Sequence, residues 1–137
     1  MLTFAASGLS EQIQKAIVEL GFETPTPIQK KTIPKLLSSN KDLIALAQTG
    51  TGKTAAFGLP IIERTNADSP LTQSLILCPT RELCLQIAND LKLYSKYVKN
   101  LNITAVYGGA RFGRKRPYAR NQSRPAGGNG IIYSSER

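Results

Sequence analysis

Residues 47–54 (AQTGTGKT) combine glycine, lysine and threonine in the order that a phosphate-binding loop requires. The glycines permit a tight turn that aims backbone N–H groups inward, and the start of a following helix adds its positive dipole end. In such a loop Lys53 would supply a full charge for the β- and γ-phosphates of a nucleotide, and Thr54 would offer its hydroxyl to Mg²⁺. Ala47 stands where the pattern usually has its first glycine. The alternative is an ordinary Gly/Thr-rich turn, and the motif by itself does not define which reaction follows.

A second stretch, residues 21–29 (GFETPTPIQ), offers groups that suit a nucleotide base. Phe22 has a flat face for stacking, and the Gln29 amide carries a donor and an acceptor that match the N6 and N7 edge of adenine. The structural alternative is that Phe22 packs in the core, while Thr26 and Gln29 form the capping box of a helix that begins at Pro27. The two roles are compatible, because a rigid cap would hold the amide in place.

The apolar pattern of the chain predicts an α/β fold with a short parallel sheet flanked by helices. Strands are expected at residues 42–47, 74–78 and 102–107, and helices at residues 9–20, 27–39, 53–64 and 82–97. Ser10 would cap the first helix, Gly21 would end it, and Pro34 would bend the second. The strands are continuously hydrophobic, as expected for parallel strands covered on both faces. Loops at the carboxyl edge of such a sheet face its ligands, and the loops that follow the three predicted strands lie at this edge.

Composition and charge limit the class of protein. The chain has 137 residues, enough for one small domain, and 41% of them are apolar, which excludes a disordered protein. Its 18 Lys and Arg against 9 Asp and Glu give a net charge of +9, which suggests a polyanionic partner such as nucleic acid or an anionic membrane surface. Cys78 and Cys84 match no metal-site spacing and are expected to be reduced thiols. Neither a signal peptide nor a run of about 18 apolar residues is visible, so we expect a soluble, cytoplasmic protein that does not contact a membrane.

Four motifs in order make residues 4–110 resemble the DEAD-box ATP-dependent RNA helicases. These are the Q motif at residues 21–29 with the isolated aromatic Phe4 upstream, motif I (AxTGxGKT) at residues 47–54, motif Ia at residues 79–83 with Gln86 beyond, and the GG element at Gly108 and Gly109. The resemblance implies a partial RecA-like P-loop domain. It also implies the family's function, which is ATP-driven remodelling of RNA duplexes or RNA–protein complexes.

The resemblance assigns roles to individual residues. Phe22 would stack on adenine and Gln29 would recognise its edge, whereas for Phe4 we expect a packing role. The phosphates of ATP and the Mg²⁺ ion would be held by Thr49, Gly50, Thr51, Gly52, Lys53 and Thr54. The RNA backbone would be contacted by Pro79, Thr80, Arg81, Gly108 and Gly109. Contacts of this kind position a strand without reading its sequence. Without the motif around it, Arg81 would be interpreted as a solvated surface arginine.

The family pattern is not visible after Gly109. The sequence has no Asp-Glu-Ala-Asp, Ser-Ala-Thr or Thr-Pro-Gly-Arg element and no second RecA-like domain. In the family these parts complete the Mg²⁺ site, activate the attacking water and stabilise the transition state. We therefore expect a helicase fragment in which Lys53 and Thr54 contribute to an incomplete catalytic site. The alternative is a non-catalytic nucleotide- or RNA-binding module, or an inactive truncation product.

Residues 111–137 are expected to form a separate, irregular segment with 7 basic residues and 1 acidic residue. Three hypotheses remain open for it. It is an RNA-binding tail in which Phe112 and Tyr118 stack among arginines, a disordered segment without function, or an aberrant sequence from a reading-frame error or artificial junction. A three-stranded sheet would leave apolar edges bare, so we also expect marginal folding and aggregation. The sequence does not indicate an oligomeric state.

Overall fold

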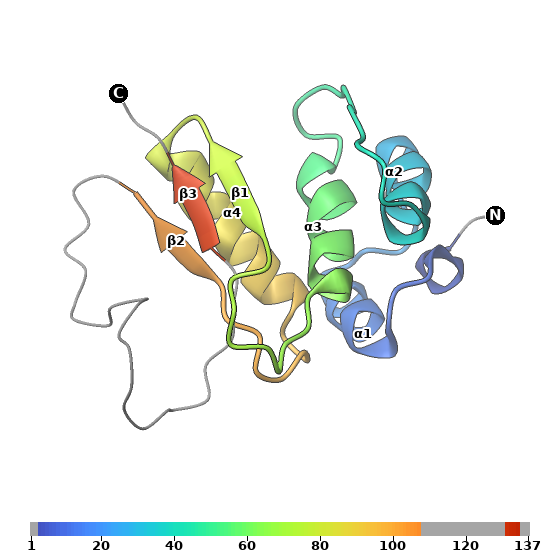
Figure 1. Ribbon diagram of the computed structural model, residues 1–137. Coiled ribbons are helices and arrows are strands. Elements are labelled where there is room, and N and C mark those ends of the chain that lie inside the picture. The colour runs from blue at the N-terminus through green and yellow to red at the C-terminus, as the bar shows by residue number, and fades with distance from the viewer. Residues whose placement is uncertain (1–2, 108–130, 135–137) are drawn as a thin grey trace.

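The computed structural model describes residues 3–107 and the backbone of residues 131–134 (Figure 1). The helices are the 3₁₀ helix η1 (Phe4–Ser7), α1 (Glu11–Glu19), α2 (Pro27–Ser38), α3 (Lys53–Arg64) and α4 (Arg81–Tyr94). The strands are β1 (Leu75–Cys78), β2 (Thr104–Val106) and β3 (Ile131–Ser134). None of the helices in this part of the chain is long and apolar enough to cross a membrane.

The three strands form a parallel sheet in the order β1-β3-β2, which confirms the predicted α/β class. Ile131 of β3 lies opposite Leu75 on one side and Thr104 on the other. Helix α4 packs against all three strands, and Figure 1 shows it behind the sheet. Ile76 and Cys78 contribute to the core, whereas the alternate residues of β1 are exposed. One face of β1 is therefore buried and the other is bare.

The prediction of a strand at residues 42–47 is wrong. These residues form no regular structure, and the side chains of Ile44 and Leu46 are 89% and 90% exposed. Figure 1 shows the connection between α2 and α3 on the side of α3 away from β1. No described strand lies beside the segment to accept its backbone hydrogen bonds, and a strand cannot form without such a partner.

The third strand comes instead from Ile131–Ser134, within the segment that we expected to be irregular. It lies between β1 and β2, and these two strands do not pair with each other directly. A strand that pairs on both sides gains two sets of backbone hydrogen bonds. Such a strand can form in a segment whose side chains show no apolar periodicity. The expected boundary at residue 110 stays a prediction, because residues 108–130 lie outside the described part of the chain.

Helices α2 and α3 lie where the sequence predicts them, and the ends of the other helices shift by one to three residues. Pro27 occupies the first turn of α2, and the helix continues through Pro34. Ser10 stands at the N-cap position of α1, but its side chain makes no capping hydrogen bond. Its backbone N–H donates instead to the carboxylate of Glu63 on α3, at 2.8 Å. Gly21 follows α1 with a φ of +81°, as a helix-ending glycine does.

The core lies among the helices. Its fully buried large side chains are Ile13, Ile17, Ile33, Leu59 and Cys84. Helices α3 and α4 approach closely at Gly58, where an added Cβ would lie 2.5 Å from Cδ2 of Leu91. This helical core contrasts with the exposed β1 face and the exposed 42–47 segment. The packing that supports the phosphate loop is therefore built mainly from helices.

We expect the exposed apolar segment to make the chain self-associate, because unpaired extended apolar segments are templates for intermolecular pairing. The variant Ile44→Lys/Leu46→Lys should remain more monomeric in sedimentation velocity at the same concentration. Its melting temperature should change little, because both side chains are exposed.

Leu59→Ala is the contrasting variant, because Leu59 is 0% exposed. It should lower the free energy of unfolding by about 2–5 kcal/mol. A monomeric wild-type chain with a sharp cooperative melt would contradict the expected association and marginal stability.

Candidate functional site

The phosphate loop takes its shape from two glycines in the left-handed region. Gly50 has a φ of +78° and Gly52 a φ of +85°, a conformation that side chains disfavour. Gly52 is the N-cap residue of α3, so the loop leads directly into the first turn of that helix. The hydroxyl of Thr51 donates to the carbonyl oxygen of Gln48 at 2.7 Å. The loop therefore delivers the backbone N–H groups at the start of a 12-residue helix.

Lys53 and Thr54 are the first two residues of α3, and both are half-buried. The ammonium group of Lys53 folds back and donates to the carbonyl oxygen of Ala47, at the other end of the loop. An ammonium group forms a stronger hydrogen bond with a phosphate oxygen than with a neutral carbonyl. The lysine is thus placed where an anion in the loop would compete for it. Thr49 and Gly50 are exposed at the loop tip.

The Gln29 amide connects the start of α2 to the start of α3. Gln29 is only 3% exposed, and its Oε1 accepts a hydrogen bond from the Thr26 N–H at 2.9 Å. Its Nε2 donates to the carbonyl oxygen of Gly52 at 3.1 Å, and the same carbonyl accepts from the N–H of Ala56. The Gln29 half of the predicted capping box is therefore formed. An amide has a second N–H and a second lone pair, so these two bonds do not use its full hydrogen-bonding capacity, and recognition of a base by Gln29 stays a prediction.

The hydroxyl of Thr26 behaves differently from the rest of the cap. It is buried and has no hydrogen-bond partner among the described residues. It would lie 3.4 Å from a Cβ added at Gly52, so it borders the loop directly. The close contact between residues 26–29 and Gly52 makes the two motifs one packed unit.

Phe22 lies in an aromatic cluster. Its ring is stacked on Phe4, with centroids 6.1 Å apart, and tilted against Tyr94 at 5.8 Å. Phe4 is 5% exposed, as its expected packing role requires, while Phe22 is half-buried. Burial, with a smaller contribution from Asp90, raises the pKa of Tyr94 to about 12, so its phenol is neutral at physiological pH. Packing of Phe22 on the core is thus observed, and its stacking on adenine stays a prediction.

The residues expected to contact RNA lie at the carboxyl end of β1 and the start of α4. Thr80 is the N-cap residue of α4, and its hydroxyl accepts from the Leu83 N–H at 3.3 Å. Pro79 and Arg81 are exposed. Gly108 and Gly109 lie outside the described residues. The hydroxyl oxygen of Thr80 therefore accepts the helix-cap hydrogen bond and keeps its O–H as a donor, and Arg81 is the charged group of this loop.

Tyr107, the residue before Gly108, belongs to this loop cluster, although the sequence pattern does not indicate it. Its ring lies under the guanidinium group of Arg81, with the Arg81 Cζ 4.5 Å from the ring centroid. The pairing depends on β1 and β2 having their carboxyl ends at the same edge of the sheet. An aromatic residue at the end of the strand predicted for residues 102–107 was the available signal, but the strand order that brings it beside Arg81 is not visible in the sequence.

The two cysteines flank the same loop. Cys78 ends β1, Cys84 lies in α4, and both are buried thiols that form no disulfide. Burial, and to a lesser degree the neighbouring Cys84, raises the pKa of the Cys78 thiol. This thiol is therefore protonated at neutral pH and is a weak nucleophile.

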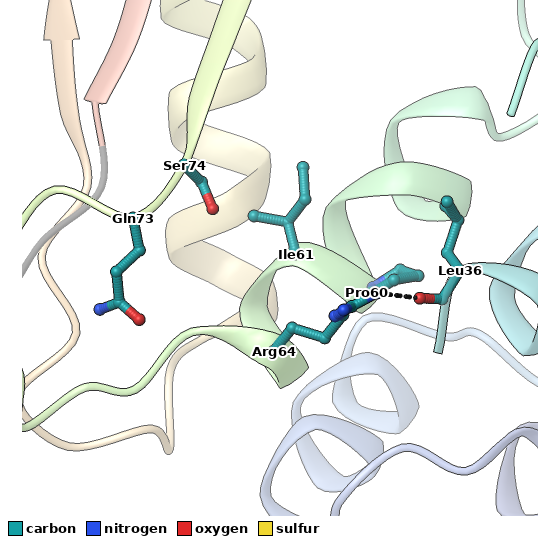
Figure 2. Close-up of a pocket in the computed structure, with 6 residues that line it drawn as sticks. All are labelled: Leu36, Pro60, Ile61, Arg64, Gln73 and Ser74. Carbon is teal, nitrogen blue, oxygen red and sulfur yellow. Dashed lines mark hydrogen bonds between the residues drawn. The ribbon is translucent and has the colours of Figure 1, made fainter. Parts of the chain in front are cut away.

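A separate hollow of about 370 Å³ lies between α3 and the segment that leads into β1 (Figure 2). Its lining residues are Leu36, Pro60, Ile61, Arg64, Gln73 and Ser74. None of these is a predicted site residue. Arg64 donates to the carbonyl oxygen of Leu36 at 2.8 Å and so ties α3 to the end of α2. The hollow is thus distinct from the phosphate loop.

An α/β fold in which a glycine-rich loop opens a helix defines a partial RecA-like P-loop domain. A protein-family model described as "DEAD/DEAH box helicase" matches residues 26–126, and the chain belongs to this family. The match extends past residue 110, where we expected the family resemblance to end.

Relatives of known name agree with this assignment. The chain is 50% identical over 109 residues to the DEAD-box ATP-dependent RNA helicase CshA of Geobacillus kaustophilus. That alignment covers 80% of this chain and 23% of CshA. It is 47% identical over 111 residues to the ATP-dependent RNA helicase DeaD of Haemophilus influenzae, covering 81% of this chain and 18% of that one. The chain thus spans about a fifth of the length of these relatives.

Solved structures give the same fold. A DEAD box protein from the hyperthermophile Methanococcus jannaschii is 34% identical, with a TM-score of 0.83, over 98% of this chain and 35% of that one. Dbp5 of Saccharomyces cerevisiae, in a structure bound to RNA and ADP BeF3, is 27% identical with a TM-score of 0.80. That alignment covers 96% of this chain and 32% of Dbp5.

The two loop glycines provide a matched test of the contact between Gln29 and the loop. A Cβ at Gly52 would lie 2.4 Å from Nε2 of Gln29, whereas a Cβ at Gly50 would meet no atom within 4 Å. Both substitutions carry the cost of a positive φ, about 1–2 kcal/mol. Gly52→Ala should therefore be less stable than Gly50→Ala by a further amount of about 1–3 kcal/mol in urea unfolding. Equal stability of the two variants would mean that Gln29 does not pack tightly on the loop in solution.

Proposed function

We propose that the chain binds ATP with Mg²⁺ at the phosphate loop and an RNA backbone at the start of α4, as part of an ATP-dependent RNA helicase. The observation that carries the proposal is the bond between Gln29 and Gly52, which joins the base-recognition segment to the phosphate loop at 3.1 Å. A structural glycine turn would not need a buried amide on its carbonyl. A nucleotide site does need its base and phosphate subsites held at a fixed separation.

The hydrogen-bond donors of the loop fit the phosphates of a nucleoside triphosphate. The residues in the proposed phosphate subsite are Thr49, Gly50, Thr51, Gly52, Lys53 and Thr54. They lie in the loop and in the first turn of α3, where backbone N–H groups lack partners within the helix, and Lys53 adds a positive charge. The hydroxyl of Thr54 suits Mg²⁺, which prefers oxygen ligands and is usually shared with the phosphates. When bound, the ion would neutralise charge on the phosphate oxygens.

Adenine would contact Phe22 and Gln29. Gln29 keeps one N–H and one lone pair beyond its bonds to Thr26 and Gly52, enough for the adenine edge. Phe22 would offer the part of its ring that Phe4 and Tyr94 do not cover. This arrangement explains why the amide is buried and yet only partly saturated.

RNA would lie across the carboxyl edge of the sheet, at Pro79, Thr80 and Arg81, and continue toward Gly108 and Gly109. The start of α4 contributes its dipole and Arg81 a full charge. Such contacts favour any RNA strand over a particular sequence. The net charge of +9 agrees with a polyanionic partner, and we place the protein in the cytoplasm, where these nucleotides and RNAs occur.

A second candidate function applies to these 137 residues taken alone, namely binding without turnover. The sequence contains no Asp-Glu-Ala-Asp element to complete a Mg²⁺ site or activate water. Positioning and charge stabilisation supply nearly all of the rate enhancement in phosphoryl transfer. We therefore propose that the 137-residue chain binds nucleotide but does not hydrolyse it at a useful rate.

We expect a fluorescent ATP analogue to bind the purified chain in the presence of Mg²⁺, and Lys53→Ala to weaken this binding about 10- to 100-fold. A hydrogen bond between charged groups contributes about 1.5–3 kcal/mol, which corresponds to that range. Lys92→Ala is the matched control, because Lys92 is an exposed lysine in the last turn of α4.

Phosphate release, measured with and without RNA, should stay at background. Equal affinity of Lys53→Ala and wild type would contradict the phosphate site. RNA-stimulated turnover that Lys53→Ala abolishes would contradict the need for further acidic residues.

A further inference from the structure

Arg81 and Tyr107 come from different elements and meet at the proposed RNA surface. Arg81 is the first residue of α4, and Tyr107 directly follows β2. The Arg81 Cζ lies 4.5 Å from the centroid of the Tyr107 ring, within the range of a cation–π contact. Arg81 is exposed, while Tyr107 is half-buried and so is the more fixed of the two.

This contact suits an arginine that must meet a phosphate. A guanidinium group on an aromatic ring uses its flat face for stacking, and its N–H donors lie around the edge of the plane. A phosphate can then accept two of these donors side by side. A long exposed side chain otherwise loses rotamer freedom when it binds, and prior placement on a ring reduces that loss.

The neighbouring groups leave this task to Arg81. The Thr80 hydroxyl oxygen accepts the Leu83 N–H in the helix cap, and its own O–H remains a neutral donor, which binds a phosphate less strongly than a charged one. The start of α4 adds a partial positive charge along the helix axis, but only Arg81 supplies a full charge at the first position. The placement of one side chain therefore governs the charged contact at this end of α4.

We propose that Tyr107 is a positioning residue for RNA binding, which holds the guanidinium group of Arg81 in place at the start of α4 for a phosphate of the RNA backbone. This inference rests on the proposed function, in which the loop before α4 contacts RNA. Tyr107 acts through Arg81 and does not itself need to touch the RNA.

The test is a double-mutant cycle on the 137-residue chain, with affinity for a labelled single-stranded oligouridylate measured by fluorescence anisotropy. Arg81→Ala should weaken binding, and Tyr107→Leu should weaken it about two- to fivefold, the effect of an exposed cation–π contact. Tyr107→Phe, which keeps the ring, should bind like wild type. In the Arg81→Ala background, Tyr107→Leu should have no further effect.

The outcomes separate the two proposals. Unchanged affinity of Arg81→Ala would overturn RNA binding at this loop, and the inference with it. An effect of Arg81→Ala together with wild-type affinity of Tyr107→Leu would overturn the positioning role alone. The positioning role would also be overturned if Tyr107→Leu reduced the RNA affinity by the same factor in the wild-type chain and in the Arg81→Ala variant.

An NMR measurement on the wild-type chain makes the test independent of whether Tyr107→Leu folds. The δ-protons of Arg81 should be shifted upfield by the Tyr107 ring in the absence of RNA. Random-coil shifts for these protons would overturn the proposal.

Discussion

The hydrogen bond from the Gln29 amide to the Gly52 carbonyl is the constraint on which the described site depends. It joins the start of α2 to the start of α3 at 3.1 Å, and Gln29 is almost fully buried while making it. Gly52 must be glycine for two independent reasons, its φ of +85° and the approach of Gln29. Residues 26–29 and the glycine-rich loop are therefore one structural unit, and under the proposed function a nucleotide would find its base and phosphate subsites already held at a fixed separation.

The helices maintain this unit without a strand before the loop. Residues 42–46 are exposed and residues 42–47 form no strand, yet α3 keeps its place because α2 packs along it and Arg64 caps the end of α2. The RNA side has a different support, because Arg81 and Tyr107 depend on the parallel sheet and on α4. The proposed nucleotide subsite is thus built on helix packing, and the proposed RNA subsite is built on strand order.

Local signals explain what the sequence predicts well. Pro27 with its cap residues defines the start of α2, and the glycine-rich loop defines the start of α3. Non-local pairing explains the failures: residues 42–47 have the composition of a buried strand, but composition does not specify a neighbour. Ile131–Ser134 pairs with two strands that are far away in the sequence, and the contact of Arg81 with Tyr107 follows from that order. Phe22 was predicted with two alternatives, and packing is the one that the structure displays.

The most direct test of this account compares two ligands on one variant. Gln29→Ala removes both the base-recognising amide and the bond to Gly52. Isothermal titration calorimetry in the presence of Mg²⁺ would give the affinities of this variant and of the wild-type chain for ATP and for inorganic tripolyphosphate. If Gln29 holds the phosphate loop, both ligands bind more weakly, although tripolyphosphate has no base. Weaker binding of ATP alone, with tripolyphosphate unchanged, would mean that Gln29 only recognises adenine, and would contradict the account.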